Sequence, residues 1–465
     1  MDFYVHAAGV LDDLKERKGS IKQLAFKNKK FDPKRTYALV CETLKYTKVL
    51  DEVIERSELL KKEKKLTRNL AIVLVHDLLL TKRGIQASGG LYKDAILRNK
   101  TRLNGEFVKY KIQKGAKSNE ELALKNPVNL PRWVRVNTIL SNKEEVIKGL
   151  GVEPVDSIDA LVPGKVYFDD CVENLLALES NISFVGNELY EKGKIIIQDK
   201  ASCFPAAVLH GMPGPVGDII DGCAAPGNKT THLAALYPNA KIFAFERDAY
   251  RVKTLQKMVR ISGAKNVEIQ HMDFTHTDVH DEKYANVTHI LLDPSCSGSG
   301  IVSRQDFLLV NEQDPVDEGD RKENLSKFQS TILKHALSFP NVRNVTYSTC
   351  SVHREENEQV VDEVLKQEKD WSCAPLESTL PQWPDRGVPE YCSDPSMAGG
   401  MIRCEPGRYG TIGFFVANLF HNKRYAEATS TATRPSVTNS KSKRKRKKKN
   451  AKGNKKAKNN AGDQA

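Results

Sequence analysis

Two cysteines occupy positions where a parallel sheet would deliver reactive side chains. Cys296 lies in the segment Asp293–Gly300, directly after an apolar stretch, and Cys350 lies in Tyr347–Ser351, after a second apolar stretch. Because the carboxyl ends of neighbouring parallel strands border one crevice, we expect both thiols to face the same ligand. A buried structural thiol is the usual reading of a lone cysteine, but it explains two at adjacent strand ends less well.

A pair of thiols of this kind suits methylation of a pyrimidine at carbon 5. That carbon becomes nucleophilic only after a thiolate adds at carbon 6, and the covalent bond must break again after methyl transfer. A carboxyl group near N3 of the base and a cationic lysine would stabilise the charge that develops. A sulfonium supplies the methyl group, so this chemistry needs no metal or redox cofactor.

The segment Asp221–Thr230 follows a third apolar stretch and predicts a nucleotide-type loop at a helix N-terminus. A dinucleotide site would require G-x-G-x-x-G, which is absent. A Walker loop is the second possibility, but Asn228 separates Gly227 from Lys229-Thr230 and moves the lysine out of register. The third possibility is S-adenosylmethionine. Its predicted contacts in this loop are Cys223, Ala224, Ala225, Pro226, Gly227, Asn228 and Lys229.

Acidic residues end the strands that follow this loop. Glu246 is placed to accept hydrogen bonds from both ribose hydroxyls, and Asp273 to meet the adenine amino group. Arg251, one turn into the next helix, would help to form the ribose side of the predicted pocket. Asp293 completes the predicted set of cofactor contacts. Each acid alone is as typical of a helix cap, but the series favours an adenosyl ligand.

Apolar strands alternate with amphipathic helices from about residue 194. We predict an α/β domain with a parallel sheet covered on both faces. The predicted strands are 216–221, 241–246, 267–270, 289–293 and 344–348, and the predicted helices are 228–237, 248–262, 322–339 and 354–366. A last apolar strand, 410–419, would close the sheet at an edge or in a hairpin.

These segments resemble the signature segments of the Nop/Sun-domain RNA (cytosine-5) methyltransferases. The resemblance covers residues 195–422 and includes Gln198-Asp199-Lys200-Ala201-Ser202 ahead of the first strand. It implies a Rossmann-like, SAM-dependent methyltransferase. Within the family the chain looks most like member five, which acts on large-subunit ribosomal RNA.

The resemblance also implies which cysteine is which. DNA cytosine-5 methyltransferases would nominate Cys296 as the nucleophile, whereas the RNA family carries that role over to Cys350 and gives Cys296 a part in product release. Asp293 and Lys229 carry over as groups around the target base and the methyl donor. The usual Asp-Pro-Pro-Cys reads Asp-Pro-Ser-Cys at residues 293–296, so the loop lacks one stiffening proline.

The rest of the chain divides by composition and charge. Residues 1–125 are predicted to be helical, with 28 basic and 16 acidic side chains. Residues 126–194 are predicted to form a small α+β, RNA-binding subdomain that presents Arg132 and Arg135 on a half-exposed strand to a phosphate backbone. The alternative is a linker subdomain that packs on its neighbour. The methyltransferase domain is placed at 195–422. Residues 423–465 are Lys-rich with few large apolar side chains, which predicts a disordered tail.

Composition excludes several classes of protein. No apolar stretch is long enough to cross a bilayer, and no Cys/His cluster has the spacing of a zinc site. Basic ends around an acidic middle favour a nucleic acid as the partner, and the resemblance makes that partner RNA. Lys443–Lys449 suits nuclear import or nucleic-acid contact, and we expect the nucleus and nucleolus. The function predicted is SAM-dependent cytosine-5 methylation of large-subunit (28S-type) rRNA. A P-loop NTPase and a non-catalytic ribosome-assembly scaffold are the alternatives.

Overall fold

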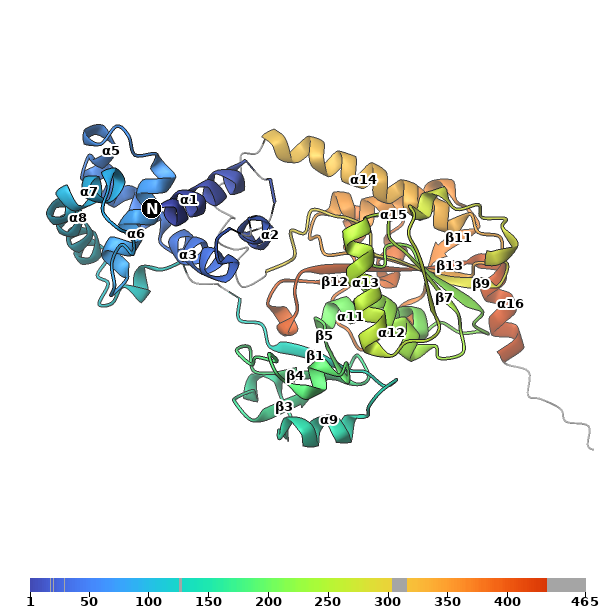
Figure 1. Cartoon of the computed structure of the whole chain (residues 1–465). Helices are drawn as coiled ribbons and strands as arrows, with labels where there is room; N and C mark the ends of the chain where they lie inside the picture. The colour runs from blue at the N-terminus through green and yellow to red at the C-terminus, as the bar shows by residue number, and fades with distance from the viewer. Residues whose placement is uncertain (17, 20, 29, 125–127, 303–315, 433–465) are drawn as a thin grey trace, which may run out of the picture.

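The computed structural model describes residues 1–432 except 17, 20, 29, 125–127 and 303–315. Figure 1 shows a helical region, a small five-stranded sheet with helices, and a larger α/β domain following one another along the chain. This agrees with the predicted fold class. Among the described helices, none is both long and apolar enough to cross a bilayer.

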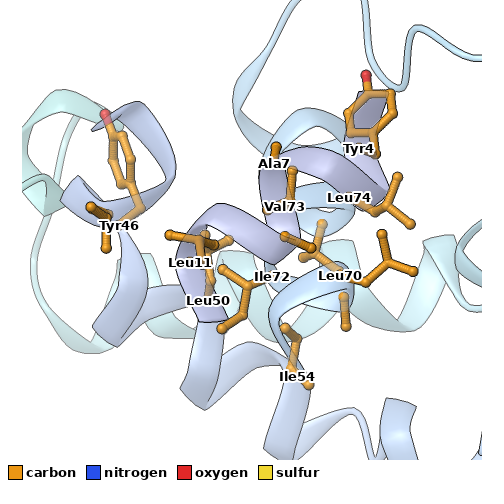
Figure 2. Close-up of a cluster of buried hydrophobic side chains, with 14 of the residues drawn as sticks. Tyr4, Ala7, Leu11, Tyr46, Leu50, Ile54, Leu70, Ile72, Val73 and Leu74 are labelled. Atoms are coloured by element: carbon orange, nitrogen blue, oxygen red, sulfur yellow. The ribbon is translucent and has the colours of Figure 1, made fainter. Parts of the chain in front are cut away.

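The N-terminal region is all helical and has its own apolar core. Its helices are α1 (Asp2–Lys15), α2 (Ile21–Lys27), α3 (Pro33–Lys45), α4 (Thr47–Arg56), α5 (Leu59–Lys62), α6 (Arg68–Leu80), α7 (Leu91–Arg98) and α8 (Lys100–Gln113). Figure 2 shows Leu11 of α1, Leu50 of α4 and Ile72 of α6 packed together. Helix α6 is apolar around most of its circumference because it lies in the middle of this core, where Leu70–Val75 are buried.

The small sheet has the strand order β2-β3-β4-β1-β5. Its elements are β1 (Arg132–Val136), α9 (Lys143–Leu150), β2 (Glu153–Val155), β3 (Lys165–Phe168), β4 (Leu175–Leu178), α10 (Glu188–Glu191) and β5 (Ile195–Ile197). Strand β1 is central and covered on both faces: Val134 and Val136 face the core under α9, and Trp133 faces the core shared with the α/β domain. The predicted half-exposed strand is therefore wrong.

The large sheet has the order β11-β13-β10-β9-β6-β7-β8, with β12 also paired to β13. Its strands are β6 (Asp218–Asp221), β7 (Ile242–Phe245), β8 (Val267–Gln270), β9 (Val287–Leu292), β10 (Asn344–Thr349), β11 (Trp371–Cys373), β12 (Met401–Cys404) and β13 (Phe414–His421). Strands β6 to β10 are parallel, and the chain reverses its direction of progress between β6 and β9. Such a switch point is where open α/β sheets bind ligands.

Helices cover both faces of this sheet, as the alternating pattern predicts. They are α11 (Lys200–His210), α12 (Asn228–Leu236), α13 (Ala249–Ser262), α14 (Val316–Leu337) and α15 (Glu358–Gln367), followed by α16 (Asn422–Ala432) after the last strand. Ile219 and Leu291 pack toward α11 and α12, whereas their neighbours Ile220 and Ile290 pack toward α14 and α15. Alternate strand residues thus supply two separate cores.

Two predictions about the C-terminal part need correction. The last strand was predicted at an edge or in a hairpin. It is not at an edge, because β13 lies between β10 and β11 and is antiparallel to both. The hairpin alternative is confirmed, since β13 also pairs antiparallel with the preceding strand β12. Helix α16 extends to Ala432, into the stretch predicted to be disordered. Residues 433–465 lie outside the described part, so the prediction for the remainder of the tail stays a prediction.

Candidate active site

The two candidate cysteines meet at the carboxyl ends of adjacent parallel strands. Cys296 follows β9 and Cys350 follows β10, and their sulfur atoms lie 3.1 Å apart. Both side chains are partly buried. The structure therefore brings together the two thiols that the sequence predicts to face one ligand.

The contact between the two sulfur atoms makes the thiols unequal in acidity. The hydrogen bond from Cys350 lowers the pKa of Cys296. The same bond, together with burial, raises the pKa of Cys350, although the positive charge of Lys229 opposes this. The pair thus loses one proton more readily than an isolated thiol and holds the second tightly.

Lys229 and Asp293 form an ion pair beside the cysteines. The Lys229 ammonium lies 2.7 Å from one Asp293 oxygen and also donates to the Ser202 hydroxyl at 3.1 Å. The other Asp293 oxygen accepts a 2.8 Å hydrogen bond from the Ser348 hydroxyl. Burial disfavours the ammonium, but Asp293 more than compensates and raises the pKa of Lys229. The lysine therefore stays charged, and its field reaches Cys350.

The predicted cofactor loop connects β6 to the N-terminus of α12. Asp221, at the end of β6, is buried and accepts a 2.7 Å hydrogen bond from the Thr230 hydroxyl of α12, which ties the two ends of the loop together. Burial raises the pKa of Asp221 to about 6. Gly227 has a φ of +112°, a conformation that glycine adopts freely and that lets α12 start at Asn228.

Arg251 joins this loop to the end of β7. Its guanidinium donates to the Ala225 carbonyl at 2.5 Å and lies 3.2 Å from the Glu246 carboxylate. Glu246 is almost fully buried, and its other oxygen accepts from the Asp248 backbone N–H at 2.9 Å. Glu246, the predicted ribose contact, is therefore connected to the cofactor loop through Arg251.

Asp273 lies at the next strand end along the sheet. It caps a short 3-10 helix, Phe274–His276, and accepts hydrogen bonds from the backbone and hydroxyl of Thr275. Its second oxygen is 3.5 Å from Arg247. The capping role accounts for its position, and the adenine contact remains a prediction.

The remaining loop residues differ in exposure. Ala224 and Ala225 pack against α13, Cys223 is partly buried, and Pro226 is exposed. The Asn228 side-chain oxygen is buried and, within the described residues, has no hydrogen-bond partner. An acceptor of that kind is suited to a ligand or water that donates a hydrogen bond.

The structure contradicts the predicted phosphate contact of Arg135. This side chain is 1% exposed and donates to Gln198, to Thr231 of α12 and, at 3.4 Å, to the Asn228 carbonyl. Burial lowers its pKa to about 10. Arg132, in contrast, is partly exposed. Arg135 faces the α/β domain because it alternates with residues that face the core under α9, so it connects the small sheet to the cofactor loop.

Sequence reasoning missed several residues that hold the site together. Ser202 and Ser348 anchor the Lys229–Asp293 pair, and the run Glu356–Glu358 is fully buried at the start of α15. The signal for these residues was a run of seven polar residues, 353–359, after the Thr-Cys segment, a pattern equally typical of the first turns of an amphipathic helix. In the described residues, no cluster of three or more His, Cys, Asp or Glu side chains could hold a metal ion.

Three family models match successive parts of the chain. The N-terminal domain of NOL1/NOP2/Sun domain family member 5 matches residues 34–123, and the ferredoxin-like domain of the same family matches residues 130–198. The model of the 16S rRNA methyltransferases RsmB/F matches residues 208–420. Cys296, Cys350, Lys229 and Asp293 all lie in this last part.

Two curated relatives match over most of their length. The chain is 70% identical to the 25S rRNA (cytosine-C(5))-methyltransferase rcm1 of Schizosaccharomyces pombe, over 92% of this chain and 93% of that protein. It is 38% identical to the 28S rRNA (cytosine-C(5))-methyltransferase of Mus musculus, over 90% of each. The crystal structure of PH0851 has the same fold, with a TM-score of 0.57, 23% identity and coverage of 83% of this chain and 90% of that one.

Proposed function

Because the chain belongs to the family of NOL1/NOP2/Sun domain family member 5, we propose that it methylates carbon 5 of a cytosine in large-subunit ribosomal RNA. The structural observation that supports this function is the 3.1 Å contact between the sulfur atoms of Cys296 and Cys350, beside the Lys229–Asp293 pair. One thiol is available to add to the base and the second to help release it.

The residues around the β6–α12 loop fit S-adenosylmethionine. The N-terminus of α12 offers backbone N–H groups for a carboxylate, and the buried carboxylate of Glu246 is an acceptor for ribose hydroxyls. Asn228 contributes a buried oxygen that still lacks a donor among the described residues. When bound, S-adenosylmethionine supplies an electrophilic methyl group.

Cys350 is proposed as the nucleophile, and the chain's own charges prepare it. In the hydrogen-bonded pair the pKa of Cys296 is lowered and that of Cys350 is raised, so Cys296 is the thiol that ionises first while Cys350 keeps its proton. Passing that proton across the 3.1 Å contact frees the Cys350 sulfur to form a bond with C6 of the base. The nearby ammonium of Lys229 stabilises negative charge in this region.

Breakdown of the adduct requires that the C5 proton leaves and that the C6–sulfur bond breaks. A base takes the C5 proton, the electron pair of the C5–H bond re-forms the C5=C6 double bond, and the electron pair of the C6–sulfur bond leaves on Cys350 as a thiolate. Cys296 is proposed to assist this step because its sulfur directly contacts the departing one. Lys229 and Asp293 are held by Ser202 and Ser348, so the charges around the base are fixed before the reaction.

The two alternative functions find no support in this geometry. In a P-loop NTPase the lysine would project toward phosphates, but Lys229 is bound to Asp293 and Ser202. A non-catalytic scaffold would have no use for the intact set of Lys229, Asp293, Cys296 and Cys350.

The test is bisulfite sequencing of large-subunit rRNA from cells with and without the chain. We expect one or a few cytosines that resist conversion only when the active chain is present. Re-expression of the wild-type chain should restore the signal, and re-expression of Cys350→Ala should not. Conversion patterns that are identical with and without the chain would refute the function.

We further propose that the basic ends grip the RNA and that the chain acts in the nucleus and nucleolus. Residues 1–125 carry a formal charge of +12, and residues 443–449 are consecutive Lys and Arg. Such charge neutralises phosphates without reading sequence, and a cluster of Lys and Arg is typical of a nuclear-import signal. Imaging of a fluorescent fusion with and without residues 433–465 tests the localisation. Equal distribution of both would contradict the role of this segment.

A further inference from the structure

Glu356 and Asn357 are consecutive, fully buried polar residues between the cysteine sites and α15. Glu356 ends the short 3-10 helix Arg354–Glu356, and Asn357 immediately precedes α15. Both side chains have an exposed fraction of 0%. A buried carboxylate and a buried amide are costly unless their hydrogen bonds are satisfied, so their partners indicate what they hold.

Glu356 holds the turn that carries Cys296. Its carboxylate accepts the Ser297 backbone N–H at 2.8 Å and the Ser297 hydroxyl at 2.5 Å. It also accepts the Gln329 amide at 3.0 Å, and the same amide nitrogen donates to the Ser295 carbonyl at 3.0 Å. Bonds therefore fix the residues on both sides of Cys296.

Asn357 holds the turn that carries Cys350 in the same manner. Its amide nitrogen donates to the Ser351 carbonyl at 2.9 Å, and its oxygen accepts the Thr349 hydroxyl at 2.6 Å. These two partners lie directly before and after Cys350. Asn357 thus contacts both neighbours of Cys350 directly, whereas Glu356 contacts the residue after Cys296 and is linked to the residue before it through Gln329.

The two turns are also joined to each other. The Gly300 N–H donates to the Cys350 carbonyl at 2.9 Å, and the hydroxyls of Ser299 and Ser351 lie 3.1 Å apart. A Cβ atom at Gly300 would come within 2.2 Å of the Gly413 carbonyl oxygen, so the chain passes close to the start of β13. These contacts limit how far the turns can separate, but they do not set the direction of either sulfur.

We propose that Glu356 and Asn357 are positioning residues that together set the separation and alignment of the Cys296 and Cys350 sulfurs. Because the two residues are adjacent, a shift of one turn is transmitted to the other through a single peptide unit. A reaction in which a proton crosses between two sulfurs tolerates errors of only about 0.5 Å in their placement. The part of this inference that concerns catalysis rests on the proposed function, whereas the geometric part does not.

Phenylarsine oxide tests the geometry without RNA or cofactor. It condenses with two thiols, forming two arsenic–sulfur bonds and releasing one water, and it binds tightly only where two sulfurs are close. The full-length wild-type chain should bind one equivalent tightly. Cys296→Ala and Cys350→Ala should each abolish this tight binding, which assigns it to this pair among the nine cysteines.

Glu356→Ala and Asn357→Ala should each weaken the arsenical's affinity by about tenfold or more. Asp362→Ala is the matched control, because Asp362 of α15 accepts the Ser393 backbone N–H at 2.9 Å and the Ser393 hydroxyl at 2.5 Å, away from both cysteines. Asp362→Ala should leave the affinity within about twofold of wild type, since the segment that Asp362 holds carries neither Cys296 nor Cys350. Glu356→Gln, which keeps an acceptor for Ser297, should recover most of the loss. If Glu356→Ala does not fold, Gln329→Leu serves as the second variant and should weaken the affinity in the same way.

The inference would be overturned if the arsenical's affinity were unchanged both in Asn357→Ala and in Glu356→Ala. Gln329→Leu takes the place of Glu356→Ala in this comparison if Glu356→Ala does not fold. An equal loss in Asp362→Ala would also overturn it, because the effect would then be a general loosening of α15. Incubation with RNA and S-adenosylmethionine separates this inference from the proposed function. If arsenical binding falls as expected but neither wild type nor Cys296→Ala ever forms a covalent RNA adduct, the positioning stands and the proposed chemistry fails. If adducts form and arsenical binding does not change, the positioning fails alone.

Discussion

The sulfur atoms of Cys296 and Cys350 lie 3.1 Å apart, although 54 residues separate the two cysteines in the sequence. Adjacent parallel strands, β9 and β10, end side by side and bring the turns together. The contact makes the two thiols chemically unequal, because one proton is held between them. Each cysteine should therefore have a distinct phenotype when it is removed.

Cys350→Ala should reduce methyl transfer by about 10³-fold or more, because the base cannot be activated without the thiolate. Binding of S-adenosylmethionine should stay near normal, since none of the predicted cofactor contacts lies on the turn after β10 that carries Cys350. Transfer of a labelled methyl group to rRNA measures the first effect, and calorimetry measures the second. Cys41→Ala, in the N-terminal core, is the control and should retain activity. Undiminished turnover in Cys350→Ala would refute the assignment.

Cys296→Ala should accumulate a covalent protein–RNA adduct. Removing Cys296 also removes the hydrogen bond that is the main cause of the raised pKa of Cys350, while Lys229 still lowers it. Cys350 should therefore ionise more readily than in the wild-type pair, although burial still raises its pKa, and lose its proton to solvent instead of to Cys296. It can then attack, but its release is impaired. A nuclease-sensitive band of reduced mobility on a denaturing gel reports the adduct. A variant that is inactive yet never trapped would identify Cys296 as the nucleophile instead.

The contribution of the Lys229–Asp293 pair to stability should be separable from its contribution to catalysis. Lys229→Met and Asp293→Asn should each destabilise the protein, by roughly 3 kcal/mol at most, because one partly buried charge then lacks its partner. The double variant should recover most of that stability, since neither charge remains. All three should stay at least about 10²-fold slower in methyl transfer. Thermal unfolding and single-turnover assays on the same samples decide this, and an active double variant would contradict it.

The local features of this chain could be predicted from the sequence, whereas the contacts between its parts could not. The strands before Cys296 and Cys350 are short apolar stretches with clear ends, so the shared crevice follows from general rules of parallel sheets. The burial of Arg135 depends on packing of the small sheet against the α/β domain, which also places the Trp133 indole N–H 2.7 Å from the Gly410 carbonyl. Contacts over 277 residues leave no local pattern.

The inner position of β13 and the roles of Glu356 and Asn357 were hidden for a related reason. An antiparallel strand that is buried between two others has the same apolar composition as one at an edge, so 410–419 could not be placed. Polar residues at a helix start are typical of capping, and only the position of the Cys296 turn shows that Glu356 bonds across to Ser297.

Asp199 should make stability depend on pH. It caps α11 by accepting the Ala201 N–H at 2.9 Å, and its burial raises its pKa from 3.8 to about 7. Because the folded state binds this proton more tightly, the carboxyl favours folding below pH 3.8, and that contribution is lost as pH rises to about 7. Asp199→Asn keeps a good cap and removes the titration. The stability of wild type relative to this variant should fall by up to about 4 kcal/mol from pH 4 to pH 7. Parallel pH profiles of the unfolding temperature would contradict this.

Deletion of residues 433–465 should weaken RNA binding and reduce its dependence on salt. This segment carries thirteen Lys and Arg and one Asp, and each lysine or arginine that neutralises a phosphate releases a counterion. The slope of log affinity against log salt concentration should become shallower by roughly 0.7 for every phosphate that the shortened chain no longer neutralises. Filter binding of a single-stranded rRNA fragment between low and physiological salt measures the slope. A chain of full length with these Lys and Arg replaced by Gln is the control for length and should behave like the deletion. Since non-specific binding carries no sequence information, both variants should still methylate the same cytosine when RNA is saturating. A deletion that leaves the salt slope unchanged would show that the grip comes from the described part of the chain alone.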